Sequence, residues 1–146
     1  YYPEINVVCT STPFSIVELE KFELLGISNC MIQISADENT MNRLYRDALF
    51  FIFPSLYEGF GMPILEAWSC HCPVALSNTS CFPEIAKNAG LYFEPTDVDD
   101  IYDKMVIMLE DESVRAELVS RGDDRVKEFS WERCAEEHLN VYRSLL

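Results

Sequence analysis

Short apolar runs alternate along this chain with segments whose apolar residues recur at helical spacing. Runs of this length, separated by helical patterns, are typical of buried parallel strands. The order strand–helix–strand therefore predicts an α/β fold, with a parallel sheet covered by helices. Leu49–Phe53 is the most apolar run, so we expect it to be the central strand. The predicted strands are Ile5–Thr10, Cys30–Ile34, Leu49–Phe53, Pro73–Ser77 and Leu91–Phe93.

Capping residues mark the ends of the predicted helices. Ser15–Leu25 stops at Gly26, a residue suited to a left-handed C-cap. A second helix follows a cap at Asp37 or Ser35 and runs to about Ala48. Its buried stripe is expected to contain Met41, Leu44, Tyr45 and Ala48. The other predicted helices are a segment from Pro63 to about Cys70, a short turn near Pro83–Ala86, Val98–Leu109, Ser113–Phe129 and Trp131–Leu146, the last with Ser130 as its cap.

The charge balance narrows the class of partner. Lys and Arg number 11 against 25 Asp and Glu, which gives a net charge of −14. This balance disfavours nucleic acid or an anionic membrane as a partner of the chain. A small anion still fits, because N–H groups at a helix start hold phosphate without basic side chains. The six cysteines are scattered through apolar segments, so we expect reduced thiols and a cytoplasmic location, with the full-length protein at most peripheral to a membrane.

The loop Ser55–Met62, after the most apolar strand, is the most unusual segment. In open parallel sheets, ligands bind beyond the carboxyl ends of the strands, where a loop meets the next helix. Gly59 and Gly61 leave room for a ligand near the backbone. Pro63 is expected at the first helical position, so the helix start forms an anion site suited to a pyrophosphate. The N–H groups expected to be unpaired there are those of Met62, Ile64 and Leu65.

Two carboxylates flank this predicted anion site. Glu58 precedes the helix, and Glu66 lies one turn inside it with its side chain leaning toward the helix start. A carboxylate is repelled by a nearby phosphate unless it accepts hydrogen bonds from hydroxyl groups, which a ribose and a transferred sugar supply. The arrangement therefore favours a nucleotide-sugar clamp. A hydrolase that uses the same two carboxylates is a weaker alternative, since a phosphate fits between them better than a glycosidic oxygen.

The segment Phe51–Ala67, FIFPSLYEGFGMPILEA, resembles the Glu-x7-Glu signature of the retaining family 4 glycosyltransferases. The resemblance extends over nearly the whole chain. It implies a Rossmann-like parallel sheet flanked by helices, as one half of the GT-B fold, with C-terminal helices and without the half's opening strand. Residues 1–146 would then be a single nucleotide-sugar-binding domain, separate from an N-terminal acceptor domain. The other segments that resemble family elements are Leu44–Ala48, Cys72–Ser77, Pro83–Ile85, Gly90–Pro95 and Phe129–Glu132.

The resemblance also implies roles for single residues. Glu58 would contact the transferred sugar or face the acceptor, and Glu66 would accept the ribose hydroxyls. Family members transfer a hexose-type sugar with retention to a glycan or glycolipid, and they need no metal or other cofactor. Backbone groups would hold the rest of the donor, with Ile34 and Ser35 beside the base and Gly59, Phe60, Gly61, Met62, Ile64 and Leu65 along the sugar and the phosphates.

The chain departs from the family pattern in its basic residues. The family's donor domain normally has an Arg and then a Lys near its first strand, which neutralise the pyrophosphate. No Arg or Lys precedes Lys21, which lies inside a predicted helix. Because catalysis depends on stabilising the departing phosphate, we expect these 146 residues alone to bind a donor weakly and to be inactive. The alternative is a non-catalytic nucleotide-binding or scaffold module with the same fold.

Overall fold

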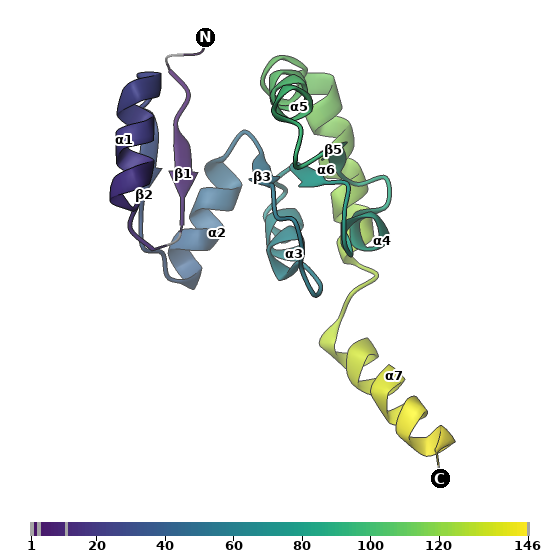
Figure 1. The fold of residues 1–146 in the computed structure, drawn as a ribbon. Coiled ribbons are helices and arrows are strands. Elements are labelled where there is room, and N and C mark those ends of the chain that lie inside the picture. The colour runs from purple at the N-terminus through teal and green to yellow at the C-terminus, as the bar shows by residue number, and fades with distance from the viewer. Residues whose placement is uncertain (1, 3, 11, 146) are drawn as a thin grey trace. The chain divides into compact units, whose positions relative to one another are not determined.

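The computed structural model describes residue 2 and residues 4–10 and 12–145 (Figure 1). The chain divides into two compact units, Tyr1–Met41 and Asn42–Leu146. Each unit has parallel strands joined through helices, so the predicted α/β class is confirmed. That residues 1–146 act as one domain stays a prediction.

The first unit contains a two-stranded parallel sheet. Strand β1 (Val7–Cys9) pairs with β2 (Met31–Gln33), and α1 (Ile16–Leu25) connects them. The start of α1 is a reciprocal cap, in which the Ser15 hydroxyl accepts the Glu18 N–H at 3.3 Å and the Glu18 carboxylate accepts the Ser15 N–H at 2.7 Å. The helix ends at Gly26 with a φ of 68°, the predicted left-handed C-cap.

Helix α2 (Glu38–Asp47) follows, and Met41 within it ends the first unit. The Asp37 carboxylate accepts the Thr40 N–H at 2.8 Å, which decides between the two predicted caps. Tyr45 is buried, with 5% of its surface exposed. Ala48 is exposed, contrary to the predicted stripe, and lies one residue beyond the end of the helix at Asp47.

The second unit is built on a three-stranded parallel sheet in the order β3-β4-β5. The strands are β3 (Phe51–Phe53), β4 (Val74–Ser77) and β5 (Leu91–Phe93). The predicted central position of the Leu49–Phe53 run is wrong for this sheet, where β4 is central and buried throughout. The apolar character of β3 reflects packing on its faces, since Phe51 contacts Tyr45 and Phe53 contacts Phe82.

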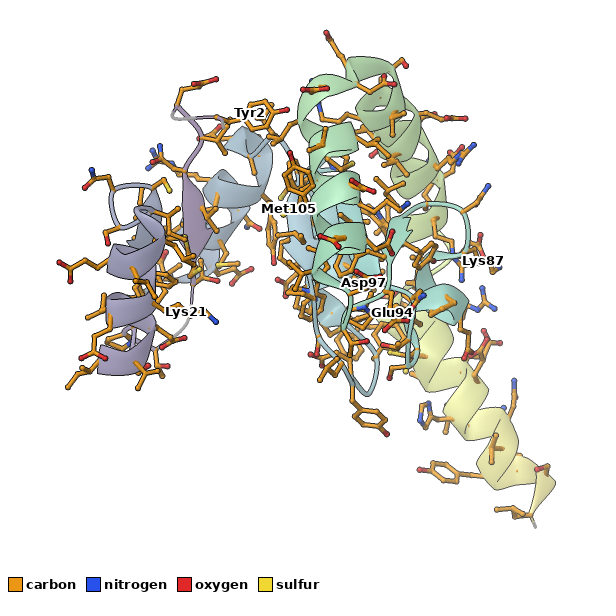
Figure 2. All side chains as sticks on the ribbon, turned by 45° about the horizontal axis from the view of Figure 1, so that its top comes forward. Tyr2, Lys21, Lys87, Glu94, Asp97 and Met105 are labelled. Carbon is orange, nitrogen blue, oxygen red and sulfur yellow. The ribbon has the colours of Figure 1, made fainter. Side chains whose placement is uncertain are left out.

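Five helices complete the second unit, and local caps define several of their starts. Asp97 accepts the N–H groups of Asp99 and Asp100, and Ser130 accepts that of Arg133. Figure 2 shows Asp97 near Glu94 at the turn before α5, where the Asp97 N–H donates to the Glu94 carbonyl at 3.1 Å. The helices are α3 (Met62–Ser69), α4 (Phe82–Ala86), α5 (Val98–Glu110), α6 (Glu112–Val126) and α7 (Trp131–Ser144).

The core of the second unit joins the sheet to its helices. One cluster of buried side chains combines Ala75, Phe93, Met108 and Leu118, from β4, β5, α5 and α6. Helix α3 is anchored separately through Trp68, which is 1% exposed and packs on α6 at Gly122. A Cβ at Gly122 would lie 2.4 Å from Trp68 Cδ1, so only glycine allows this approach. The packing fixes the helix that begins at the predicted anion site.

Candidate functional site

Gly61 shapes the start of α3. It is the N-cap residue, with φ and ψ of 96° and 48°, a left-handed conformation that favours glycine. A Cβ at this position would also lie 3.1 Å from Ile64 Cδ1 and 3.1 Å from Phe82 Cε1. Met62 is the first helical residue, so Pro63 occupies the second position, one residue later than predicted.

The first turn of α3 uses one of the N–H groups that we expected to be open. The Ile64 N–H donates to the Gly61 carbonyl at 2.9 Å, so the prediction that it is unpaired is wrong. The reason is a tight first turn with an i to i+3 bond, which is common at helix starts. Pro63 has no N–H, and a helix supplies no acceptor for its N-cap and first N–H groups. Met62, which is exposed, and the N-cap Gly61, which is buried, are therefore the donors that we expect this helix end to offer to a ligand. The open N–H predicted for Leu65 stays a prediction.

Glu58 is held by its neighbours in the loop and by the segment after β4. The Ser55 hydroxyl donates to Glu58 Oε1 at 3.0 Å. The Ser80 hydroxyl accepts the Glu58 N–H at 3.2 Å and donates to the Glu58 carbonyl at 2.9 Å. The residues on either side of Ser80 also donate hydrogen bonds to the loop. The Thr79 hydroxyl donates to the Leu56 carbonyl at 3.3 Å, and the Cys81 thiol donates to the Phe60 carbonyl at 3.2 Å.

Glu66 is exposed on α3, and its carboxylate accepts a hydrogen bond from a buried phenol. The Tyr45 hydroxyl lies 3.3 Å from Glu66 Oε2. Burial raises the pKa of Tyr45, and the negative charge of Glu66 raises it further. Tyr45 therefore keeps its proton at neutral pH and acts as the donor in this pair. Glu58 and Glu66 thus each have a hydroxyl group as a hydrogen-bond partner.

The other predicted site residues differ in exposure. Gly59 is exposed, and a Cβ there would meet nothing within 4 Å. Phe60 is partly exposed and makes an edge contact with Phe129. Ile64 is fully buried. The remaining members are Met62, which is exposed, and Leu65, which is half-buried. Ile34 and Ser35 belong to the first unit, where Ile34 is half-buried and Ser35 is exposed.

Sequence reasoning missed four residues that position this site, namely Tyr45, Thr79, Ser80 and Cys81. Tyr45 was predicted only as a buried helix residue. Its contact with Glu66 spans 21 positions, and that of Ser80 with Glu58 spans 22. Periodicity and local spacing carry no signal for contacts at that separation.

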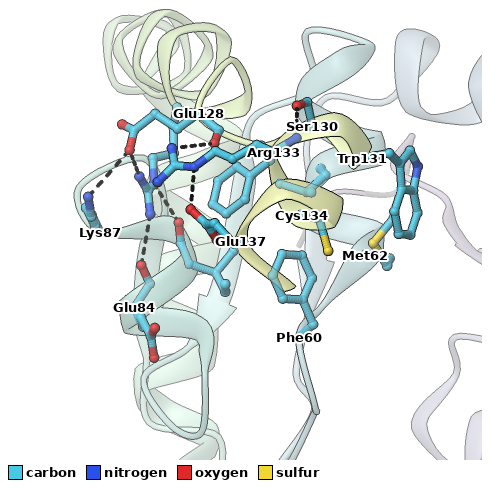
Figure 3. Close-up of a pocket in the computed structure, with 14 residues that line it drawn as sticks. Phe60, Met62, Glu84, Lys87, Glu128, Ser130, Trp131, Arg133, Cys134 and Glu137 are labelled. Carbon is cyan, nitrogen blue, oxygen red and sulfur yellow. Dashed lines mark hydrogen bonds and ion pairs between the residues drawn. The ribbon is translucent and has the colours of Figure 1, made fainter. Parts of the chain in front are cut away.

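A pocket of about 760 Å³ lies beside the loop, between it and the segment that joins α6 to α7 (Figure 3). Phe60 and Met62 line it from the loop side, and Phe129 and Trp131 line it from the other. Phe60 and Phe129 meet with their ring centroids 5.8 Å apart. The pocket therefore combines an aromatic wall with a charged rim.

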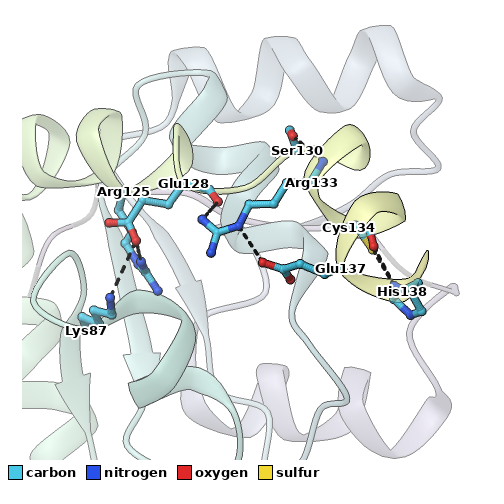
Figure 4. A network of polar contacts seen from close by, with 8 residues as sticks. All are labelled: Lys87, Arg125, Glu128, Ser130, Arg133, Cys134, Glu137 and His138. Carbon is cyan, nitrogen blue, oxygen red and sulfur yellow. Dashed lines mark hydrogen bonds and ion pairs between the residues drawn. The ribbon is translucent and has the colours of Figure 1, made fainter. Parts of the chain in front are cut away.

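The basic side chains of this rim are bound to the protein's own acceptors (Figure 4). Arg125 donates to the Ile85 carbonyl at 2.8 Å and pairs with the Glu128 carboxylate. Glu128 also pairs with Lys87, at 3.7 Å. Arg133 donates to Glu137 at 2.8 Å and to the Glu128 carbonyl at 3.1 Å. The basic side chains Lys87, Arg125 and Arg133 of the rim therefore already have acceptors within the protein.

Three further properties bear on the chemistry. All six cysteines are free thiols. Residues 2, 4–10 and 12–145 contain no cluster of three or more His, Cys, Asp or Glu side chains that would suit a metal ion. Within the same residues, no helix combines the length and the apolar character needed to cross a bilayer.

Comparisons with known proteins identify the family and agree with the fold. The family described as "Glycosyl transferases group 1" matches residues 18–125. The O-antigen chain mannosyltransferase B of Escherichia coli is 46% identical over 102 residues, which are 70% of this chain and 27% of that protein. The chain thus spans about a quarter of that relative's length.

Solved structures match over most of the chain. The C-terminal domain of the group 1 glycosyl transferase LpcC from Francisella tularensis has a TM-score of 0.73 and 31% identity, and the match covers 87% of this chain and 70% of that one. Anabaena HepE in complex with UDP and glucose has a TM-score of 0.76 at 18% identity, over 90% of this chain and 36% of that one. The fold predicted from the resemblance, one half of the GT-B architecture, is confirmed. The chain belongs to the group 1 family of glycosyltransferases.

Proposed function

We propose that this chain is the donor-binding domain of a retaining glycosyltransferase that uses a nucleotide sugar. The donor's diphosphate would lie at the start of α3, where the N–H groups of Gly61 and Met62 and the helix dipole favour an anion. Glu66 would accept hydrogen bonds from the ribose, and Glu58 would face the transferred sugar. No metal or other cofactor is required by this arrangement.

One observation carries the proposal. Two carboxylates flank a helix start opened by Gly61, and each is oriented by a hydroxyl donor, Ser55 for Glu58 and Tyr45 for Glu66. A carboxylate held in this way remains an acceptor, so it suits hydroxyl groups of a sugar rather than the phosphate. The phosphate is left to the backbone amides. In sugar transfer these amides would stabilise the charge that develops on the departing diphosphate.

The relatives suggest the substrates. HepE was solved with UDP and glucose, and the E. coli relative is a mannosyltransferase of O-antigen chains. We therefore propose a hexose such as mannose as the transferred sugar and a glycan or glycolipid as the acceptor, held by a further N-terminal domain. The free thiols support a reducing, cytoplasmic location for the reaction.

Isothermal titration calorimetry of the 146-residue chain with UDP, GDP and ADP tests the proposal. We expect weak binding of at least one nucleotide, because Lys87, Arg125 and Arg133 of the neighbouring pocket are already paired within the protein. Glu66→Ala should reduce the affinity about tenfold, which corresponds to loss of a hydrogen bond to a charged group. Glu136→Ala, at an exposed position of α7, is the matched control and should bind like the wild type.

Two results would contradict the proposal. Equal affinity of the Glu66→Ala variant and the wild type would show that Glu66 does not bind the ribose. Absence of binding by all three nucleotides at millimolar concentration would favour the non-catalytic scaffold module.

A further inference from the structure

Glu66 needs a fixed orientation to recognise two adjacent hydroxyl groups. A glutamate side chain loses conformational entropy when it is ordered. If Glu66 were mobile, this cost would be met at each binding event. The contact that orders it is the hydrogen bond from Tyr45, 3.3 Å from Oε2.

Tyr45 is a rigid donor. Its side chain is 5% exposed, and its ring meets Phe51 edge-on, with centroids 5.3 Å apart and an angle of 83° between the planes. Phe51 belongs to β3, so the phenol is fixed to the sheet of the second unit. The Tyr45 hydroxyl therefore does not follow the carboxylate, and Glu66 adopts the rotamer that reaches it.

The direction of this hydrogen bond determines what Glu66 can still bind. Tyr45 keeps its proton at neutral pH, because burial and the nearby carboxylate both raise its pKa. It donates to one carboxylate oxygen, so the second oxygen and the remaining lone pairs of Glu66 stay acceptors. A vicinal diol, which offers two O–H donors on one face, matches such a carboxylate.

We propose that Tyr45 is a positioning residue that presents the Glu66 carboxylate to the 2′- and 3′-hydroxyls of the donor's ribose, and so selects ribonucleotides over 2′-deoxyribonucleotides. This inference rests on the proposed function. It adds a residue outside the signature segment, and it predicts a sugar selectivity that a merely structural tyrosine would not produce.

Calorimetric titrations with UDP and dUDP, and with GDP and dGDP, test this role. The wild type should bind the ribonucleotide more tightly than its deoxy counterpart. Tyr45→Phe removes one hydroxyl and keeps the ring, so it should weaken ribonucleotide binding about fivefold. It should weaken deoxynucleotide binding less, because a 2′-deoxynucleotide offers only its 3′-hydroxyl to Glu66. The matched control is Tyr92→Phe, which also removes the hydroxyl of a partly buried tyrosine, one that donates to the Lys87 carbonyl at 2.8 Å. It should keep the wild-type ratio of the two affinities.

A second measurement separates the possible failures. In the Glu66→Ala background, Tyr45→Phe should cause no further loss of affinity, because the group that it positions is gone. Two results would overturn the role of Tyr45. One is a further loss of affinity in the Glu66→Ala background, and the other is an unchanged ratio of ribonucleotide to deoxynucleotide affinity in the Tyr45→Phe variant. If either result is found and Glu66→Ala alone still weakens nucleotide binding, the proposed function stands without the role of Tyr45. If Glu66→Ala has no effect, the proposed function fails and this inference fails with it.

Discussion

The hydroxyl of Ser80 holds the backbone of Glu58 at both of its polar groups, accepting the N–H at 3.2 Å and donating to the carbonyl at 2.9 Å. The two residues are 22 positions apart. Ser80 has a φ of 56°, a left-handed conformation that is costly for a residue other than glycine. The segment after β4 thus fixes the loop after β3, and the position of Glu58 depends on it.

Substitution of Ser80 should weaken sugar binding whatever its effect on stability. Ser80→Ala and Ser80→Gly both remove the hydroxyl, but only the glycine relieves the left-handed backbone. We expect Ser80→Ala to lower the free energy of unfolding by about 1–2 kcal/mol and Ser80→Gly to lower it less. Both should weaken the binding of a nucleotide sugar to the same degree, measured by calorimetry beside urea denaturation. Wild-type affinity of the glycine variant would show that the hydroxyl does not position Glu58.

Glu58→Gln should act on the sugar and not on the nucleotide. Glutamine keeps the size of the side chain and an oxygen that can accept the hydrogen bond from Ser55, but it removes the negative charge. We expect about a tenfold loss of affinity for a nucleotide sugar, which is about 1.4 kcal/mol, and little change for the nucleoside diphosphate. Titrations with UDP-glucose and GDP-mannose, each beside its free nucleotide, measure the difference. An equal loss for sugar and free nucleotide would mean that Glu58 contacts another part of the donor.

Gly122→Ala should destabilise the second unit. The new methyl group would lie 2.4 Å from Trp68 Cδ1, so α3 and α6 would have to move apart. Overpacking of this kind costs about 1–3 kcal/mol, measurable by urea denaturation. Gly59→Ala is the matched control, because a methyl group there meets nothing within 4 Å, and its stability should equal that of the wild type. Similar stabilities of the two variants would contradict the tight packing of α3 on α6.

Alkaline pH should destabilise the protein partly through Tyr92. Burial raises the pKa of Tyr92 to about 12, although the nearby Arg125 acts in the opposite direction. Since the unfolded chain releases this proton near pH 10, the stability contributed by neutral Tyr92 is complete below pH 10 and is lost as the pH rises toward 12. At pH 11 the loss is about 1.4 kcal/mol relative to pH 9.

The Tyr92→Phe variant isolates this contribution. It should be less stable than the wild type at pH 9, where the hydrogen bond to the Lys87 carbonyl is missing, and should lose less stability between pH 9 and pH 11. Urea denaturation at the two pH values measures both effects. The same pH dependence in both proteins would show that Tyr92 titrates normally in the folded state.

Local features of the fold were predictable from the sequence. The caps at Gly26 and Ser130 depend on residues within four positions of each other, and both are found as predicted. Ser15, predicted as the first residue of its helix, is the N-cap instead. Strand β5 begins and ends at the predicted residues Leu91 and Phe93. The order of the strands in the sheet could not be predicted from local sequence. The apolar character of β3 depends on what packs against its two faces, and it does not indicate which strands lie beside it.

The site was predictable only in part, because some of its contacts join residues that are far apart in the sequence. The sequence placed Glu58, Gly61 and Glu66 around a helix start, and the structure has them on that loop and helix. The hydrogen bond within the first turn of α3, from Ile64 to Gly61, depends on a tightening of the backbone that spacing does not reveal. The contacts of Tyr45 and Ser80 join distant parts of the chain, and only the folded structure brings them to the site.

The most direct test of the central claim locates the bound diphosphate by NMR. The ¹⁵N-labelled chain would be titrated with UDP and with GDP while its amide signals are followed. We predict that the amide signals of Gly61 and Met62 shift most, because these groups donate to the diphosphate. Glu66→Ala should lower the affinity obtained from the titration, while the largest shifts stay at the same two amides. Largest shifts at Trp131 and Cys134, in the pocket beside α7, with Gly61 and Met62 unchanged, would contradict the account.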